Sequence, residues 1–118
     1  MSRKNPLPKS FNYAYEGIKE AFKNEPNFRI HLIFSFAVLI LGIIVKLSKI
    51  EWIILTFTIF FVLILELINT SLEAITDLVS PKIKPRAKVA KDVAAAAVLL
   101  SSLLALIIGL FIFIPKLQ

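Results

Sequence analysis

The stretch WIILTFTIFFVLILELINTSLEAITD, residues 52–77, decides the fold because it joins two kinds of sequence without a break. Residues 52–65 are almost wholly apolar, and the chain then continues without glycine or proline through polar residues spaced three or four apart. This spacing is typical of one face of an α-helix. The stretch therefore predicts a helix that crosses a bilayer and carries a polar stripe at one end.

The polar stripe consists of Glu66, Asn69, Glu73 and Asp77. At about 100° per residue these side chains fall within about 80° of one another around the helix. Each ionisable group in a membrane costs about 2.5–3.5 kcal/mol on insertion scales, so it normally serves a function or meets a partner. Carboxylates one or two turns apart suit Mg²⁺ coordination, and a desolvated carboxylate suits general-base catalysis. The alternative is that the stripe only joins helices, with Asp77 in water.

The composition places the rest of the chain in the bilayer as well. Of 118 residues, 58% are hydrophobic, which is more than a soluble core of this size can bury. The absence of cysteine excludes disulfides and thiolate metal sites. The three glycines form neither a GxxxxGK[ST] loop nor a GxGxxG turn, so side chains and a metal must hold any nucleotide.

Working outward from this stretch, we expect an all-α membrane protein with a single domain over residues 1–118. The predicted membrane spans cover about residues 28–47, 52–79 and 88–114, and the alanine run Ala94–Ala97 suits close helix contact. Residues 10–25 form a shorter helix, apolar on one face and charged on the other. We expect this helix to lie in the membrane interface, although packing against a partner is the alternative.

The net charge of +6 is distributed unevenly along the chain. Most of the basic residues lie before the first span or in the connector between the second and third spans, and the other side holds only Lys46, Lys49 and Lys116. This bias predicts a cytoplasmic N-terminus and a cytoplasmic second connector, where ATP is available. In a membrane protein, such charge sets orientation more often than it binds nucleic acid, so we expect no nucleic-acid partner.

Three further places carry candidate site residues. Lys91 and Asp92 begin the third span on the same side as the stripe, where a lysine suits phosphate binding. The alternative is a lysine that reaches the membrane surface next to an acid at a helix N-terminus. Glu25 precedes Pro26 at the start of the first span and is placed to share a cation with the stripe. His31 lies one or two turns further in, and we expect it to contact a lipid head or a neighbouring helix.

Three motifs together resemble the prokaryotic diacylglycerol kinase family. These are ELINTSLEAITD at residues 66–77, AKDVAAAAVLL at residues 90–100 and NEPNFRIH at residues 24–31. The last of them resembles the Gram-positive-type branch, whose members are undecaprenol kinases. The resemblance covers nearly the whole chain after Lys9.

This resemblance implies a homotrimer of three-span protomers in the plasma membrane, with active sites shared between subunits. It implies transfer of the γ-phosphate of MgATP to a lipid hydroxyl. By motif position, Glu66 resembles the general base, and Glu25 and Glu73 resemble the Mg²⁺ ligands. The residues that the resemblance places at the nucleotide are Tyr13, Glu25, Asn69, Glu73, Asp77, Lys91 and Asp92. The expected contacts to the lipid substrate are Glu66 and His31.

The chain departs from the family pattern at three places. Ile83-Lys84 replaces an aromatic–histidine pair near the adenosine, which puts nucleotide selectivity in doubt. Alanine occupies all of Ala94–Ala97, where the branch often has a glycine. His31 replaces a carboxylate of the diacylglycerol-specific branch, which favours undecaprenol as the substrate.

Three other interpretations remain open at this point. Diacylglycerol is the alternative substrate, and nothing in the site residues excludes it. A small proton-coupled exporter with Glu66 as its coupling carboxylate would leave Asn69, Glu73 and Lys91-Asp92 without a role. A non-catalytic assembly protein with a polar seam is the third. Only the kinase requires MgATP.

Overall fold

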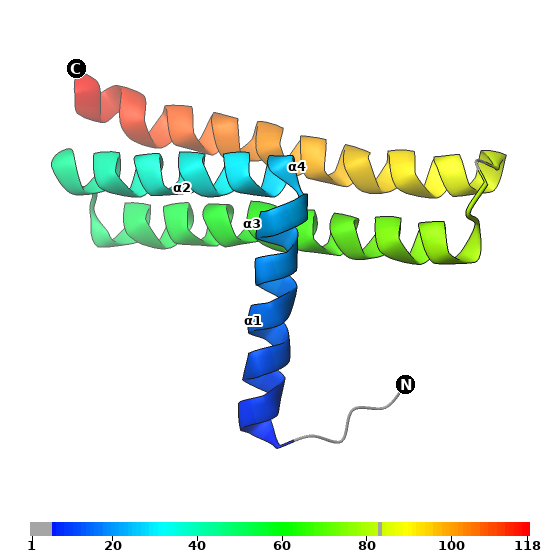
Figure 1. The fold of residues 1–118 in the computed structure, drawn as a ribbon. Helices are drawn as coiled ribbons and strands as arrows, with labels where there is room; N and C mark the ends of the chain where they lie inside the picture. The colour runs from blue at the N-terminus through cyan, green and yellow to red at the C-terminus, as the bar shows by residue number, and fades with distance from the viewer. Residues whose placement is uncertain (1–5, 83) are drawn as a thin grey trace.

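The computed structural model describes residues 6–82 and 84–118. These residues form four helices, α1 (Leu7–Asn24), α2 (Pro26–Ile44), α3 (Lys49–Val79) and α4 (Pro85–Leu117), without a strand in these ranges. Helices α2, α3 and α4 lie lengthwise beside one another, and α1 projects steeply from them (Figure 1). Ile83 and the N-terminal basic residues Arg3 and Lys4, to which part of the sequence predictions refers, lie outside the described residues.

Helices α2, α3 and α4 are each long and apolar enough to cross a membrane. The predicted all-helical membrane fold with three spans is therefore confirmed. All four helices begin two or three residues earlier than predicted, including α1, at Leu7 rather than near residue 10, and α4, at Pro85 rather than near residue 88. Helices α1 and α4 both have a proline in the first turn, where a missing N–H costs nothing and the fixed φ favours the helix.

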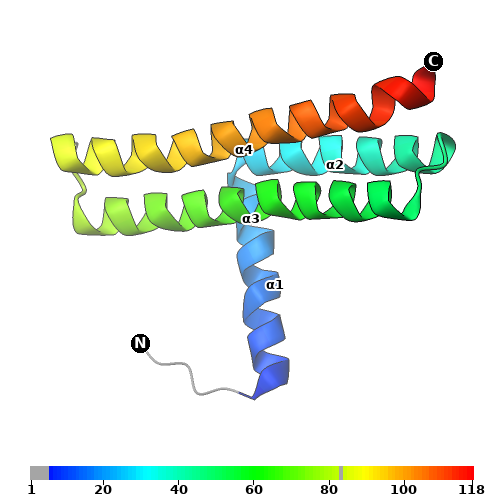
Figure 2. The ribbon, with the colours of Figure 1, turned by 180° about the vertical axis from the view of Figure 1, so that it is seen from behind.

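The spanning helices differ greatly in length. The 19 residues of α2 extend over about 28 Å, close to the hydrocarbon thickness of a bilayer. The 31 residues of α3 extend over about 46 Å. Figure 2 shows that α2 begins near the middle of α3, so the Val79 end of α3 and the Pro85 end of α4 reach well past it. With α2 placed in the bilayer, these two ends stand in the aqueous phase.

The junction between α1 and α2 fixes the direction of the surface helix. Arg29 Nη1 donates hydrogen bonds to the carbonyl oxygens of Phe22 and Lys23, at 2.8 and 3.1 Å. Both carbonyls belong to the last turn of α1, where they lack partners within the helix. The large apolar side chains of α1, among them Phe11, Ile18 and Phe22, are exposed, as expected of a helix that lies on a membrane surface, whereas the small Ala21 is buried.

At the end of α2 that lies away from α1, a tight turn joins α2 to α3. Lys46 adopts a left-handed conformation with φ of 56°. Its N–H donates to the Ile43 carbonyl at 3.3 Å, and the Leu47 N–H donates to the Gly42 carbonyl at 3.2 Å, which is a Schellman motif. Ser48 and Glu51 then exchange hydrogen bonds in a capping box that begins α3.

The best-packed apolar contacts lie at this same end, far from the polar stripe. The cluster consists of Leu47, Leu55, Ile112 and Phe113. Nearby, Lys116 Nζ lies 3.0 Å from Glu51 Oε1 and connects the end of α4 to the start of α3. This end is therefore the structural anchor of the bundle.

Gly42 should be required for this anchor. A Cβ at this position would lie 2.8 Å from Trp52 Cη2 and 2.9 Å from Leu47 Cδ1, which is too close for either contact. We expect Gly42→Ala to destabilise the protein by about 1–2 kcal/mol, since overpacking outweighs the gain in helix propensity. The measurement is unfolding of the detergent-purified protein by SDS titration.

Gly17→Ala is the matched control, because a Cβ at Gly17 meets no atom within 4 Å. It should be neutral or stabilising. Equal stability of the Gly42→Ala and Gly17→Ala proteins would contradict the proposed close packing.

Candidate active site

The polar stripe runs from the centre of the bundle to its aqueous end. Glu66 is 1% exposed and Asn69 is 8% exposed, so both are buried. Glu73 is half-buried and Asp77 is exposed. The four side chains therefore pass from a dry environment into water along a single helix.

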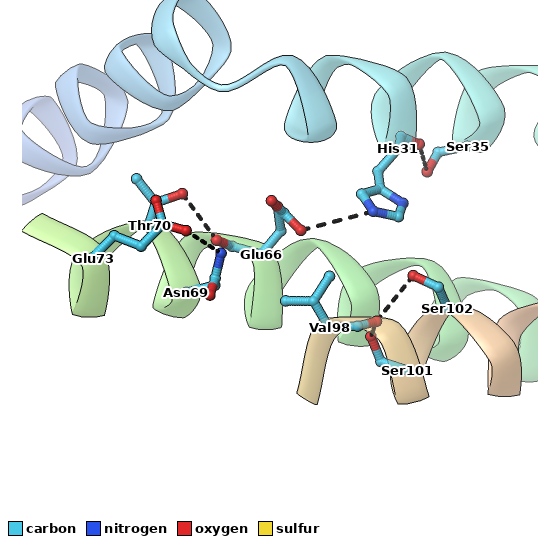
Figure 3. Close-up of polar contacts among 9 residues, drawn as sticks. All are labelled: His31, Ser35, Glu66, Asn69, Thr70, Glu73, Val98, Ser101 and Ser102. Carbon is cyan, nitrogen blue, oxygen red and sulfur yellow. Dashed lines mark hydrogen bonds and ion pairs between the residues drawn. The ribbon is translucent and has the colours of Figure 1, made fainter. Parts of the chain in front are cut away.

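Glu66 points from α3 toward His31 on α2, as Figure 3 shows. His31 Nε2 and Glu66 Oε2 lie 3.7 Å apart, which is too far for a hydrogen bond. Glu66 Oε2 is buried and accepts no hydrogen bond within the described chain. The geometry leaves a strong acceptor beside an imidazole nitrogen, with a gap between them.

Asn69 orients the next carboxylate of the stripe. Its Nδ2 donates a hydrogen bond to Glu73 Oε1 at 3.2 Å, one turn further along α3 (Figure 3). Asn69 Oδ1 is buried and accepts no hydrogen bond from the residues described. Buried polar atoms are normally satisfied, so two such acceptors in neighbouring turns indicate a site prepared for a donor or a cation.

Glu66 has two acidic neighbours, one at the junction of α1 and α2 and one on α3. The charges of Glu25 and Glu73 both lie close enough to Glu66 to interact with it electrostatically. Like charges repel strongly in a partly desolvated site, and a cation relieves that repulsion. Residues 6–82 and 84–118 contain no cluster of three or more Asp, Glu, His or Cys side chains able to hold a metal.

Lys91 and Asp77 form an ion pair between α4 and α3 at the aqueous end. Lys91 also interacts electrostatically with Glu73. Asp92 instead binds Lys88, one turn earlier on α4, with 2.6 Å between Oδ2 and Nζ. A hollow of about 230 Å³ lies among these groups and the connector between α3 and α4, and Asp77, Lys82, Lys88, Lys91 and Asp92 line it.

The structure brings most of the predicted site residues into one continuous region. At the buried end of the stripe, Glu66 has Glu25 and His31 as neighbours. At its exposed end, Asp77 lines the same hollow as Lys91 and Asp92. Tyr13 lies on α1, where it is 42% exposed, and its nucleotide contact stays a prediction. The catalytic and binding roles of all these residues also stay predictions.

Sequence reasoning missed two residues that shape this region. Arg29 holds the end of α1 next to Glu25 through its hydrogen bond to the Phe22 carbonyl. The sequence signalled this role only by placing a basic residue in the first turn of a helix that begins with proline. Lys88 is the partner of Asp92, and its spacing of four residues along one helix did signal the pair.

Comparisons with known proteins agree with this arrangement of carboxylates, lysine and spanning helices. A family model described as prokaryotic diacylglycerol kinase matches residues 12–113. The undecaprenol kinase of Bacillus subtilis (strain 168) is 48% identical over 113 residues, which cover 96% of this chain and 92% of that protein.

Two diacylglycerol kinases match shorter parts of the chain. The protein from Synechocystis sp. is 42% identical over 69 residues, which cover 58% of this chain and 39% of that protein. The protein from Haemophilus influenzae is 39% identical over 72 residues, which cover 60% of each chain.

The fold and these relatives define a membrane-embedded kinase that transfers phosphate from ATP to a lipid. The chain belongs to the prokaryotic diacylglycerol kinase family.

The ion pair between Lys91 and Asp77 should contribute little to folding, because both side chains are substantially exposed, at 42% and 64%. We therefore expect Asp77→Asn to leave the midpoint of SDS unfolding close to that of the unmodified protein. A loss as large as that of Gly42→Ala would mean that the pair is structural and that Lys91 is not available to a ligand.

Proposed function

We propose that this chain phosphorylates the hydroxyl of undecaprenol with MgATP as the phosphate donor, and that residues 1–118 form a single lipid kinase domain. The support is the 48% identity to an undecaprenol kinase over 96% of the chain. His31, which lies beside Glu66, adds to it because the diacylglycerol-specific branch has a carboxylate there. Diacylglycerol is the alternative substrate, supported by the names of the two shorter matches.

Glu25 and Glu73 are the proposed Mg²⁺ ligands. Their oxygens are the hard donors that Mg²⁺ prefers, and it is usually held by one or two carboxylates together with substrate phosphates. The repulsion of Glu66 by Glu25 and by Glu73 supports a cation here, and two protein ligands suit a metal that arrives with ATP. Bound Mg²⁺ would neutralise part of the negative charge of the ATP phosphates.

The exposed end of the stripe is the proposed nucleotide site. Lys91 would exchange Asp77 for phosphate oxygens, which is feasible because both partners are exposed. Asp92, Asp77 and Asn69 would complete the contacts, with Tyr13 approaching from α1. The hollow of about 230 Å³ beside Lys91 supplies room for part of the nucleotide.

Glu66 is the proposed general base. Its Oε2 is buried and accepts no hydrogen bond from the described residues, so a substrate hydroxyl can donate to it directly. The hydroxyl proton passes to this carboxylate as the oxygen attacks the γ-phosphorus of ATP, and ADP leaves. Phosphoryl transfer depends mainly on positioning and charge neutralisation, so no glycine-rich loop is required.

The proposed location is the plasma membrane. In the proposed orientation, the N-terminus and the connector between α3 and α4 lie in the cytoplasm. The basic residues on that side support it. The family resemblance supports a homotrimer. In this orientation the aqueous ends of α3 and α4 face cytoplasmic ATP.

The decisive experiment is transfer of labelled phosphate from ATP by the reconstituted protein, with undecaprenol and diacylglycerol offered side by side. We expect undecaprenol to be labelled in the presence of Mg²⁺ and not in the presence of a chelator. Predominant labelling of diacylglycerol would overturn the substrate but not the mechanism. Folded protein that labels neither lipid would overturn the proposal.

Glu66→Gln keeps the size of the side chain and removes its basicity. We expect it to lower kcat by about 10²–10⁴-fold, the usual contribution of a general base. Glu51→Gln is the matched control, because Glu51 lies on the same helix at the opposite end and binds Lys116. An active Glu66→Gln enzyme would refute the assignment.

Glu73→Ala should act on the donor side instead. We expect a higher KM for MgATP and a need for more Mg²⁺, because one proposed ligand is lost. The measurement is the initial rate over a matrix of Mg²⁺ and ATP concentrations. An unchanged Mg²⁺ requirement would remove Glu73 from the proposed ligand set.

A further inference from the structure

A cavity of about 140 Å³, partly open at the surface of the bundle, is lined at one end by His31, which faces Glu66. It extends from His31 away from the aqueous end, toward the turn between α2 and α3. All three spanning helices line it, with Phe34 and Val38 from α2, Thr58 and Val62 from α3, and Ala105 and Gly109 from α4.

The cavity wall offers almost no hydrogen-bond donors. The hydroxyls of Ser35 and Thr58 line it, but each donates to a carbonyl of its own helix, at 2.7 Å in both cases. The other lining residues apart from His31 are apolar side chains and Gly109. An apolar wall of this kind favours contact with hydrocarbon over contact with water.

The cavity has the size of a short branched hydrocarbon. Its volume of about 140 Å³ is close to the roughly 150 Å³ of an apolar cavity that holds benzene, which has six carbons. Gly109 adds to the space, because a Cβ there would meet no atom within 4 Å. A group of about five or six carbons therefore matches the volume of the cavity.

The end of the cavity matches the other requirement of a lipid alcohol. His31 Nε2 and Glu66 Oε2 are 3.7 Å apart, so an oxygen between them can lie about 2.8 Å from each. A hydroxyl there donates to the carboxylate and accepts from the imidazole N–H. A hydrocarbon attached to that oxygen enters the cavity.

We propose that this cavity holds the first isoprenoid unit of the acceptor alcohol, with the hydroxyl between Glu66 and His31 and with Gly109 as a specificity-determining residue. The inference rests on the proposed polyprenol kinase function and names what selects the substrate. An isoprenoid unit has five carbons and no polar atom, which suits the apolar side chains that line the cavity. In diacylglycerol, ester oxygens follow the hydroxyl and would be buried without donors, at a cost in binding.

The test fills the cavity without touching the donor site. Gly109→Leu places a side chain into space that is empty, and Ala105→Val does so more mildly. We expect Gly109→Leu to lower the ratio of kcat/KM for undecaprenol to kcat/KM for dioctanoylglycerol at least tenfold, with an unchanged KM for MgATP. Ala105→Val should lower the ratio by less. Leu106→Phe is the control for added bulk on α4, because Leu106 is 59% exposed, and it should leave the ratio unchanged.

Three outcomes would overturn the inference. The first is an unchanged ratio in both cavity variants, and the second is an equal fall in activity toward both lipids. The third is a fall in the ratio for Leu106→Phe as large as that for Gly109→Leu. Failure of the unmodified protein to phosphorylate undecaprenol would be a different result, since it refutes the proposed function before any variant is measured.

Discussion

The burial of one carboxylate among three apolar helices is the constraint on which the rest of this structure depends. A charged side chain in the membrane is costly, and Glu66 is 1% exposed. The neighbouring imidazole is too distant for a hydrogen bond, so one oxygen stays unsatisfied at a cost of about 1–3 kcal/mol. The bundle tolerates this cost because it is well packed elsewhere, around Leu55 and Ile112 and at the close contact of Gly42 with Trp52.

The unequal helix lengths determine what surrounds this carboxylate. Because α2 begins near the middle of α3 (Figure 1), Glu66 has His31 of α2 as its neighbour, whereas Asp77 pairs with Lys91 of α4. The stripe therefore spans the boundary between hydrocarbon and water. Equal helix lengths would either draw Asp77 and Lys91 into the bilayer or expose Glu66 to solvent.

The sequence was sufficient to predict features that depend on one helix. Spacing alone placed Glu66, Asn69, Glu73 and Asp77 on a single face, and hydropathy alone identified the spans. The starts of α1 and α4 were predicted three residues too late, although the proline in the first turn of each helix suits a helix start.

What the sequence could not predict depends on the register between helices. The distance of 3.7 Å between His31 Nε2 and Glu66 Oε2 depends on the position of α2 along α3. The pairing of Lys91 with Asp77 depends on how α4 packs on α3. The cavity beside Gly109 needs all three helices at once. Thr58 and Ser35 gave a weak signal, since hydroxyls in an apolar run often bond to their own backbone rather than mark a site.

A lipid kinase must bring together two substrates that dissolve in different media, and this arrangement solves that problem with a single helix. The charged end of α3 is exposed and borders the proposed nucleotide site, and its apolar half lines the apolar cavity of about 140 Å³. Glu66 lies between the two regions, and in the proposed mechanism it receives the hydroxyl of the lipid alcohol at the place where the phosphate is delivered.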